Sequence, residues 1–277
     1  MRDRPPPPGA VKQITSFANP IVKEIRGLAL PKNRKASGLF VAEGLKLVAD
    51  AIEVGWTVRT LVHASGVGDQ PLVRRLAATT HARGGTVISV GEAVLAKISR
   101  RDNPQTVLGV FEQRLIAAKD VRPRQDDVWI ALEAVRDPGN LGTIVRTADA
   151  VGAAGVILVG ETVDPFSPEA VRATMGSVFA VPLARTTKTE FDALATGWRG
   201  TVVGTHLSGT VDYRKADYKP PVLLVMGGEQ AGLTPESAAL CRTLVKIPMA
   251  GKADSLNLAI ATAVMLFEIR RGALTLA

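Results

Sequence analysis

The chain has 277 residues, of which 46% are hydrophobic, 22% charged and 4% aromatic, which excludes a disordered or fibrous protein and predicts a folded α/β protein with an aliphatic core. The formal net charge of +8 favours a polyanionic partner. Cys241 is the only cysteine, which excludes an internal disulfide and a cysteine-based metal cluster within one chain and favours a reducing cytoplasm.

The first part of the sequence predicts a short tail and a small α/β domain. Residues 1–10 are dominated by proline, and we expect a disordered tail there. Apolar periodicity predicts helices at 20–30, 45–54, 72–82 and 93–98 and strands at 38–42, 58–63, 86–90 and 106–111. We therefore expect residues 11–116 to form one domain and the polar residues 117–126 to form a linker.

Residues 127–277 predict a second α/β domain with buried parallel strands, because short runs of Val, Ile and Leu lie between turn residues. We expect strands at 129–135, 155–160, 180–183, 201–205, 221–226 and 244–247, a helix at 141–151, and a long apolar helix from Leu256 to about Arg270. The sequence contains neither a signal-peptide pattern nor an apolar span of ~20 residues. We therefore expect a cytoplasmic protein that is not held in a membrane.

The excess positive charge lies in the first part of the chain. Residues 1–120 hold 18 Lys or Arg and 10 Asp or Glu, a net charge of +8, whereas residues 121–277 hold 16 of each, a net charge of zero. This distribution indicates that one domain captures nucleic acid through its phosphates while the other has a different task. A solvated basic surface without a partner is the alternative that the charge alone leaves open.

Three segments of the second domain carry polar residues near the ends of predicted strands. In the first, EAVRDPGNLGTIVRTAD, a turn leads into a helix, and Asn140 and Arg146 can both point above the carboxyl edge of the sheet. Ligands of open α/β sheets bind at that edge. The alternative for this segment alone is a helix cap at Asn140 and a solvated Arg146.

The second segment, LLVMGGEQAGL, is a strand followed by Gly227, Gly228 and Glu229. The glycines allow a ligand to approach the backbone closely, and the carboxylate can accept hydrogen bonds from hydroxyl or amino groups. The alternative is an ordinary turn into a helix capped by Thr234. No GxGxxG pattern occurs in the chain, which disfavours an NAD or nucleotide-sugar enzyme and the usual Rossmann methyltransferase.

The third segment, IPMAGKADSLNLA, is a loop followed by the long apolar helix. Ser255 is predicted to cap that helix. Asn257 lies near the helix N-terminus in an apolar segment, and its amide is free to reach towards a bound substrate.

In this order, the three segments resemble motifs 1, 2 and 3 of the SpoU (TrmH) family of the SPOUT class, whose members methylate ribose 2′-hydroxyls in tRNA or ribosomal RNA. The patterns are NxGxxxR from Asn140 to Arg146, GxExxG from Gly227 to Gly232, and IPMxGxxxSLN from Ile247 to Asn257. The resemblance includes the substrate-facing stretch at residues 171–183, where Thr174 replaces a frequent serine, and covers roughly residues 12–273.

The resemblance implies a fold, a cofactor and a set of site residues. The C-terminal domain is expected to be a parallel-sheet α/β domain with a trefoil knot, the SPOUT fold, beside a smaller N-terminal α/β RNA-binding domain. Its loops are expected to hold S-adenosylmethionine at Met226, Gly227, Gly228, Ile247, Met249 and Leu256. Arg146 matches the catalytic arginine, either as a base or as an electrostatic clamp, while ribose and cofactor are oriented by Asn140, Glu229, Ser255 and Asn257. A homodimer is implied, with the apolar helix after Leu256 packed against the partner.

The expected partner is RNA, with ribosomal RNA favoured over tRNA because a separate domain precedes the knot. Basic residues expected to bind RNA are Arg34, Lys35, Arg74, Arg75, Arg100, Arg101 and Arg172. His63, His81 and His206 do not have ligand spacing, so no metal site is expected. The alternative function is a non-catalytic RNA-binding or ribosome-assembly protein that retains the fold.

Overall fold

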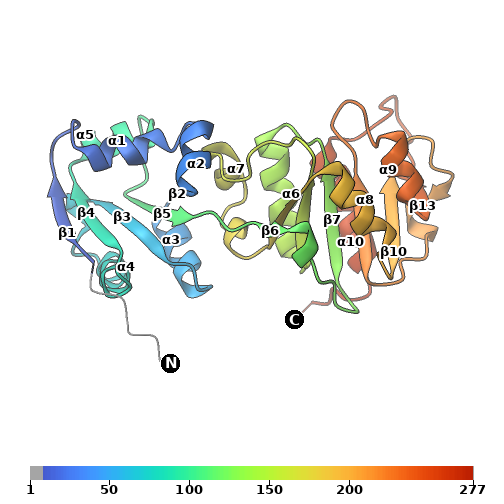
Figure 1. Ribbon diagram of the computed structural model, residues 1–277, viewed down its shortest axis with the longest axis horizontal. Helices are drawn as coiled ribbons and strands as arrows, with labels where there is room; N and C mark the ends of the chain where they lie inside the picture. The colour runs from blue at the N-terminus through green and yellow to red at the C-terminus, as the bar shows by residue number, and fades with distance from the viewer. Residues whose placement is uncertain (1–8, 277) are drawn as a thin grey trace. The chain divides into compact units, whose positions relative to one another are not determined.

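The computed structural model describes residues 9–276, and the chain divides into two compact units (Figure 1). The N-terminal unit comprises the residues up to Gln113 together with Phe166–Arg172. The C-terminal unit comprises Arg114–Pro165 and the residues from Ala173 onward. Most of the predicted proline-rich tail, residues 1–8, lies outside the described residues.

The N-terminal unit contains a five-stranded mixed sheet in the order β1-β4-β3-β5-β2. The strands are β1 (Val11–Ile14), β2 (Leu39–Glu43), β3 (Val58–Ala64), β4 (Thr86–Val90) and β5 (Val107–Glu112). Strands β1, β4 and β3 are parallel, whereas β5 runs antiparallel to both β3 and β2. Four of these strands match the predicted ones within two residues at each end, and β1 was not predicted.

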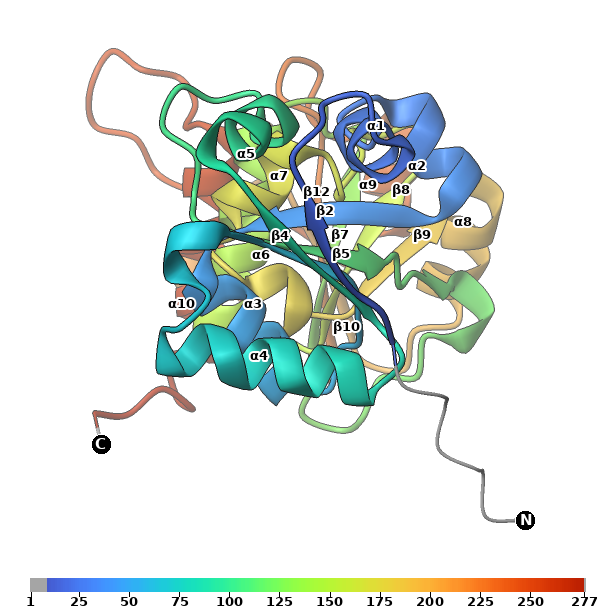
Figure 2. The ribbon, with the colours of Figure 1, turned by 90° about the vertical axis from the view of Figure 1, so that its left-hand side faces the viewer.

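Helices cover both faces of this sheet. They are α1 (Pro20–Gly27), α2 (Pro31–Ser37), α3 (Leu45–Glu53), α4 (Pro71–Ala82), α5 (Glu92–Ser99) and α7 (Pro168–Ala173). Figure 2 shows α1 and α5 on one face of the sheet and α3 and α4 on the other. The core beneath α1 and α5 is aliphatic, as the composition predicts, and includes Ile25, Val62, Ile88 and Leu95.

The structure corrects the expectation that Arg34 lies on an RNA-binding surface. Arg34 is 2% exposed, and its Nη1 donates hydrogen bonds to the carbonyl oxygens of Leu28 (2.8 Å) and Ala29 (3.0 Å), just beyond α1. A buried guanidinium needs such acceptors to offset its desolvation. Arg34 therefore holds α2 against the end of α1 and is not available to phosphates.

The boundary between the units differs from the predicted one at two places. Ile116–Ala117, expected to end the first domain and begin the linker, form strand β6 and pair with β9 in the C-terminal unit. Phe166–Arg172, expected in the second domain, belong to the N-terminal unit, where the Phe166 ring lies 4.7 Å from that of Phe40. Phe166 is 1% exposed, so burial of this aromatic ring explains why the segment joins the other core.

The C-terminal unit contains an eight-stranded sheet in the order β11-β13-β10-β12-β7-β8-β9-β6, and every pair of neighbours is parallel. Besides β6, the strands are β7 (Val128–Glu133), β8 (Gly155–Val159), β9 (Leu183–Thr186), β10 (Thr201–Thr205), β11 (Val211–Asp212), β12 (Val222–Met226) and β13 (Thr243–Lys246). Every residue of the central strands β7, β8 and β12 is buried, which explains their unbroken apolar sequences. The predicted α/β class with a parallel sheet is confirmed.

The helices of this unit are α6 (Pro138–Ala150), α8 (Lys188–Thr196), α9 (Pro235–Leu240) and α10 (Leu258–Arg270). Helix α6 contacts α10, and α8 contacts α9 (Figure 1). Helix α8 was not predicted, although Thr187 and Glu190 form a capping box at its start. Strand β9 begins at Leu183 instead of Ala180, because a short 3-10 helix occupies Ser177–Phe179.

Helix α10 is the most apolar of these helices, but it has only 13 residues. Crossing a bilayer takes about 20 apolar residues in a helix. Within residues 9–276, no helix is long and apolar enough to span a membrane.

A buried carboxylate fixes the start of α9 to the end of β7. Glu133 is 6% exposed and accepts hydrogen bonds from the Thr234 backbone N–H (3.1 Å), the Thr234 hydroxyl (2.9 Å) and the Ser237 hydroxyl (3.0 Å). Thr234 caps α9, as predicted, through its side-chain oxygen and the Ser237 N–H. The loop between β12 and α9 is thereby anchored at its far end.

We expect Glu133→Ala to lower the free energy of unfolding by about 1–3 kcal/mol, because buried donors of Thr234 and Ser237 would lose their acceptor. Urea unfolding followed by circular dichroism measures this change. The matched control is Glu112→Ala, which removes an exposed carboxylate 3.6 Å from Arg59 and should leave the unfolding midpoint unchanged. A wild-type midpoint for Glu133→Ala would contradict the anchoring role.

Candidate cofactor and substrate site

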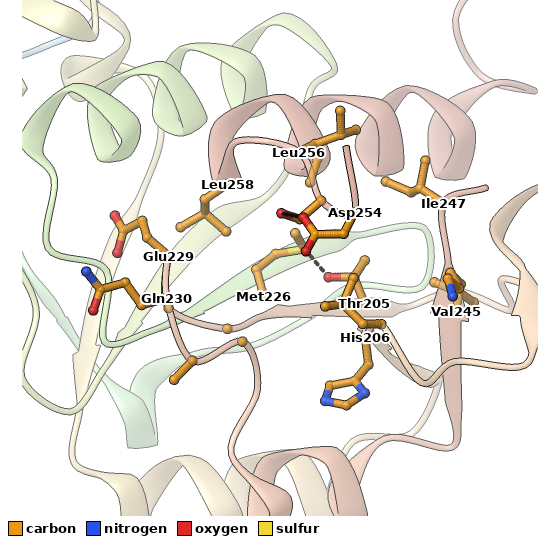
Figure 3. Close-up of a pocket in the computed structure, with 18 of the residues that line it drawn as sticks. Thr205, His206, Met226, Glu229, Gln230, Val245, Ile247, Asp254, Leu256 and Leu258 are labelled. Carbon is orange, nitrogen blue, oxygen red and sulfur yellow. Dashed lines mark hydrogen bonds between the residues drawn. The ribbon is translucent and has the colours of Figure 1, made fainter. Parts of the chain in front are cut away.

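A pocket of about 360 Å³ lies at the carboxyl edge of the parallel sheet in the C-terminal unit (Figure 3). Strands β13, β10 and β12 are neighbours, so their carboxyl ends meet at this edge. The chain after each strand supplies part of the lining, and α10 completes it. The lining comprises residues 205–207 from the end of β10 onward, 226–232 from the end of β12 onward, 245–247, 249 and 254–256 from β13 onward, and Leu258 and Ala261 of α10.

The loop after β12 folds tightly on itself. Gly228 and Gly232 exchange backbone hydrogen bonds of 3.1 and 3.0 Å, and Gly232 has a left-handed φ of 68°. A Cβ atom on Gly227 would lie 1.9 Å from the carbonyl carbon of Gly232, far inside van der Waals contact. Gly227 is therefore required for the backbone to close upon itself beside the pocket.

The opposite wall comes from the loop that follows β13. Figure 3 shows Ile247, Asp254 and Leu256 on this side, with Met226 and Thr205 at the strand ends. The Thr205 hydroxyl donates a hydrogen bond to the Met226 sulfur at 3.3 Å. This contact links the ends of two adjacent strands at the floor of the pocket.

A chain of hydrogen bonds joins all three predicted motifs. Asn140 donates its side-chain N–H to Glu229 (3.3 Å), and Asn257 donates to the side-chain oxygen of Asn140 (2.9 Å). Glu229 also accepts hydrogen bonds from the backbone N–H groups of Arg136 (3.3 Å) and Asp137 (3.2 Å). The structure thus brings Asn140, Glu229 and Asn257 together, with Glu229 in the pocket lining and the two asparagines outside it.

These hydrogen bonds keep Glu229 charged. Burial raises the pKa of Glu229, but hydrogen bonds from backbone N–H groups and from Asn140 lower it by more, so the pKa lies below its usual value. Glu229 is therefore an acceptor of hydrogen bonds at neutral pH, suited to hydroxyl or amino groups of a ligand.

The cap of α10 differs from the predicted one, and the alternative of a cap at Asn140 is wrong. Asn257, not Ser255, caps α10, because its oxygen accepts hydrogen bonds from the N–H groups of Ala259 (2.8 Å) and Ile260 (3.3 Å). Ser255 lies before the helix, in the pocket lining, and donates to Asp254 (3.0 Å). Asp137, not Asn140, caps α6. These assignments leave both ends of the Asn140 amide, and the N–H group of the Asn257 amide, for the hydrogen-bond chain.

The lining suits a ligand with an apolar ring, hydroxyl or amino donors, and no phosphate. Carboxylate acceptors come from Glu229 and Asp254, and the basic residues in the lining are His206 and Lys246. Apolar surface comes from Met226, Val245, Ile247, Met249, Leu256 and Leu258. S-adenosylmethionine has this chemistry, because it carries an adenine ring, ribose hydroxyls, an amino group and a positively charged sulfonium. All six positions predicted to bind it line the pocket, as do Glu229 and Ser255.

Arg146 lies outside this lining, on the exposed side of α6. Within residues 9–276, no hydrogen bond or ion pair holds its side chain, so the guanidinium is free to meet a substrate. Of the residues predicted to bind RNA, the exposed ones are Lys35, Arg74, Arg75, Arg100 and Arg172, and Arg101 is partly exposed.

The sequence interpretation missed the residues after β10. Thr205, His206 and Leu207 line the pocket, although only the strand itself was predicted. Their position in the sequence could have indicated them, because ligands of open α/β sheets bind at the carboxyl ends of the strands, and these residues end a predicted strand. Asp254 was missed because it occupies a variable position of the third motif, directly before Ser255.

Comparison with known proteins extends over both units. The model of the SpoU rRNA Methylase family matches residues 127–267, and that of the MRM3-like substrate binding domain matches residues 19–109. A crystal structure of an AdoMet-bound rRNA methyltransferase from Sinorhizobium meliloti has a TM-score of 0.91 and 56% sequence identity, covering 96% of this chain and 100% of that chain.

Curated relatives act on two kinds of RNA. A 23S rRNA (uridine(2479)-2′-O)-methyltransferase from Streptomyces viridochromogenes is 32% identical over 270 residues, which are 95% of this chain and 93% of the relative. A tRNA (guanosine(18)-2′-O)-methyltransferase from Escherichia coli (strain K12) is 37% identical over 155 residues, or 53% of this chain and 65% of the relative. With its three motifs joined by hydrogen bonds, the chain belongs to the SpoU rRNA methylase family.

Proposed function

We propose that this protein transfers a methyl group from S-adenosylmethionine to a ribose 2′-hydroxyl of ribosomal RNA. The observation that carries the proposal is the pocket itself, in which all six expected cofactor positions meet Glu229 and Ser255. The non-catalytic alternative is disfavoured, because Asn140, Glu229 and Asn257 are present and joined by hydrogen bonds. An RNA-binding protein that did not methylate would have no use for this arrangement.

The residues of the pocket would hold the cofactor and orient the ribose. When bound, S-adenosylmethionine supplies a methyl group on a positively charged sulfur. Met226, Ile247 and Leu256 offer apolar surface to its ring, and backbone groups near Gly227 and Gly228 can approach it closely. Glu229 is held in place by Asn140, so it offers a fixed acceptor to hydroxyl or amino donors.

Arg146 would act on the RNA as an electrostatic clamp. A guanidinium keeps its proton at any ordinary pH, and a nearby phosphate favours the charged form further. Arg146 therefore suits the binding of a substrate phosphate and the stabilisation of negative charge that develops on the attacking oxygen. A role as a base would require the loss of that proton, which makes it the less economical mechanism.

The N-terminal unit would capture the RNA. The first 120 residues carry the whole net charge of +8, and Lys35, Arg74 and Arg100 are exposed there. Similarity to the 23S rRNA enzyme spans both units, whereas similarity to the tRNA enzyme spans about half of the chain. This difference favours ribosomal RNA as the substrate. A cytoplasmic location follows from that substrate.

We also infer a trefoil knot and a homodimer. The knot is supported by family membership and by the way in which the loops after β10, β12 and β13 share one pocket. The dimer is supported by α10, whose residues Ile260 and Phe267 are 51% and 52% exposed although both are large and apolar. They are seven residues apart and so lie on one side of the helix, where a second copy would cover them.

Gly227→Ala should weaken the binding of S-adenosylmethionine by at least roughly tenfold, or about 1.4 kcal/mol, because the new Cβ would push the loop open at Gly232. Isothermal titration calorimetry measures the affinity. Gly272→Ala is the matched control, since nothing lies within 4 Å of a Cβ at that position. Unchanged affinity in Gly227→Ala would show that the closed loop does not shape the cofactor site.

Arg146→Ala should abolish methylation and largely spare the affinity for S-adenosylmethionine, since Arg146 lies outside the pocket lining. Ribose-methylation mapping of total RNA from cells with the gene, without it, and with the variant measures the first effect. Arg199→Ala, a loss of another exposed arginine of the same unit, is the control and should methylate normally. If no ribose position in ribosomal RNA depended on the gene, the proposed substrate would be wrong.

Phe267→Asp should shift a dimer towards monomer, because a carboxylate would then be buried in an apolar interface. Light scattering at micromolar concentration measures the mass. Val54→Asp is the control, as Val54 is 54% exposed in the N-terminal unit and should not alter the mass. A monomeric wild-type protein under these conditions would refute the dimer.

A further inference from the structure

A second cavity, of about 300 Å³, lies entirely within the N-terminal unit. It is bordered by α1, the end of β2, the end of α5 and the inserted helix α7. The S-adenosylmethionine site is in the other unit, so this cavity has no part in cofactor binding. Its size is within the range of small-ligand pockets.

The floor of the cavity is apolar. Ile25, Leu28, Ile98 and Val171 line it and are each at most 6% exposed. Val171 comes from α7, so the cavity has this wall only because residues 166–172 pack into the N-terminal unit. An apolar surface of this kind can stack against the face of a planar ring.

Four arginines surround the apolar floor: Arg26, Arg100, Arg101 and Arg172. Arg100 ends α5 with a left-handed φ of 56°, a conformation that a residue other than glycine or asparagine seldom adopts. This conformation ends the helix and directs the chain of Arg100 and Arg101 along the cavity border. The positive border favours an anion, and a nucleic-acid phosphate is the anion that this unit is expected to meet.

Two carboxylates line the cavity, the exposed Glu169 and the half-buried Glu43, and the half-buried one distinguishes the cavity from a simple phosphate site. Glu43 is 16% exposed at its side chain and lies 3.5 Å from the Nη1 atom of Arg101, a long contact. Burial raises the pKa of Glu43 by more than Arg172 and Arg101 lower it. A phosphate would be repelled by Glu43, so a ligand that fits here must carry hydrogen-bond donors as well as an anion.

We propose that this cavity binds one unpaired guanosine nucleotide of the substrate RNA, with its base on the apolar floor, its donors on Glu43 and its phosphate at the arginines. The proposal rests on the proposed function as an RNA methyltransferase. The Watson–Crick edge of guanine presents adjacent N1–H and N2–H donors, which match the two oxygens of a carboxylate. Uracil presents one N–H between two carbonyl oxygens, which a carboxylate repels. Recognition of unpaired bases is the usual route to sequence-specific RNA binding.

The test compares the binding of two fluorescent RNA heptamers, UUUUUUU and UUUGUUU, to the full-length protein by anisotropy at low salt. Wild type should bind the guanosine-containing heptamer roughly tenfold more tightly, within the range for one bidentate contact to a base. Glu43→Gln should remove this preference and bind both heptamers alike. Arg26→Ala should weaken both and keep the preference, because Arg26 lines the cavity and, unlike Arg172 and Arg101, does not lower the pKa of Glu43.

The control is Glu53→Gln, which removes a carboxylate from an exposed ion pair with Arg75 (3.4 Å) outside the cavity and should keep the preference for guanosine. Equal affinity of wild type for both heptamers, including no binding to either, overturns the proposal. So does a preference that survives in Glu43→Gln. Methylation of ribosomal RNA by the same wild-type preparation is measured in parallel. Methylation without a guanosine preference refutes the cavity proposal alone, whereas its absence refutes the proposed function.

Discussion

The site depends on one hydrogen-bonded junction between Asn140, Glu229 and Asn257. It joins side chains that are 89 and 117 residues apart in sequence. Each asparagine uses both ends of its amide: the Asn140 oxygen accepts from Asn257 while its nitrogen donates to Glu229, and the Asn257 oxygen caps α10. An aspartate at either position would lose the donor and add a negative charge beside Glu229. This requirement explains why the motifs contain an amide at both positions.

The same junction explains how the pocket works without a glycine-rich phosphate loop. A phosphate site gathers backbone N–H groups around an anionic ligand. Here the N–H groups of Arg136 and Asp137 at the start of α6 point at Glu229, so the protein supplies the anion itself. The helix N-terminus is thereby neutralised, and a carboxylate is displayed to a ligand that carries hydroxyl, amino and sulfonium groups. The parallel sheet contributes the edge, and residues of the second and third motifs line the pocket there.

Short-range patterns singled out segments that line the pocket, because the second and third motifs follow strands β12 and β13. Strand runs such as VWIALE and VLLVM are unambiguous, and parallel strands bring their carboxyl ends together. Patterns failed where the role of a residue depends on its contacts in the folded chain, or where two nearby residues could both cap the same helix. Arg34 resembles any surface arginine until Leu28 and Ala29 present carbonyls to it. Whether Ser255 or Asn257 caps α10 depends on a difference of two residues in where the helix begins. Sequence patterns do not place a helix boundary that closely.

The insertion of residues 166–172 into the N-terminal unit means that the chain connects the two units at more than one point. The chain passes between the units after Gln113, after Pro165 and again after Arg172, so α7 is tethered at both ends to the C-terminal unit. Just beyond it, Ser177 donates a 2.7 Å hydrogen bond to Asp149 on α6, the helix that also carries Arg146. In the sequence, few residues therefore separate Arg172, at the border of the N-terminal cavity, from Ser177, which is hydrogen-bonded to α6. Residues that are adjacent in the chain thus belong to two different cores, because burial of Phe166 holds the segment in the N-terminal unit while the hydrogen bond of Ser177 holds the following residues on α6.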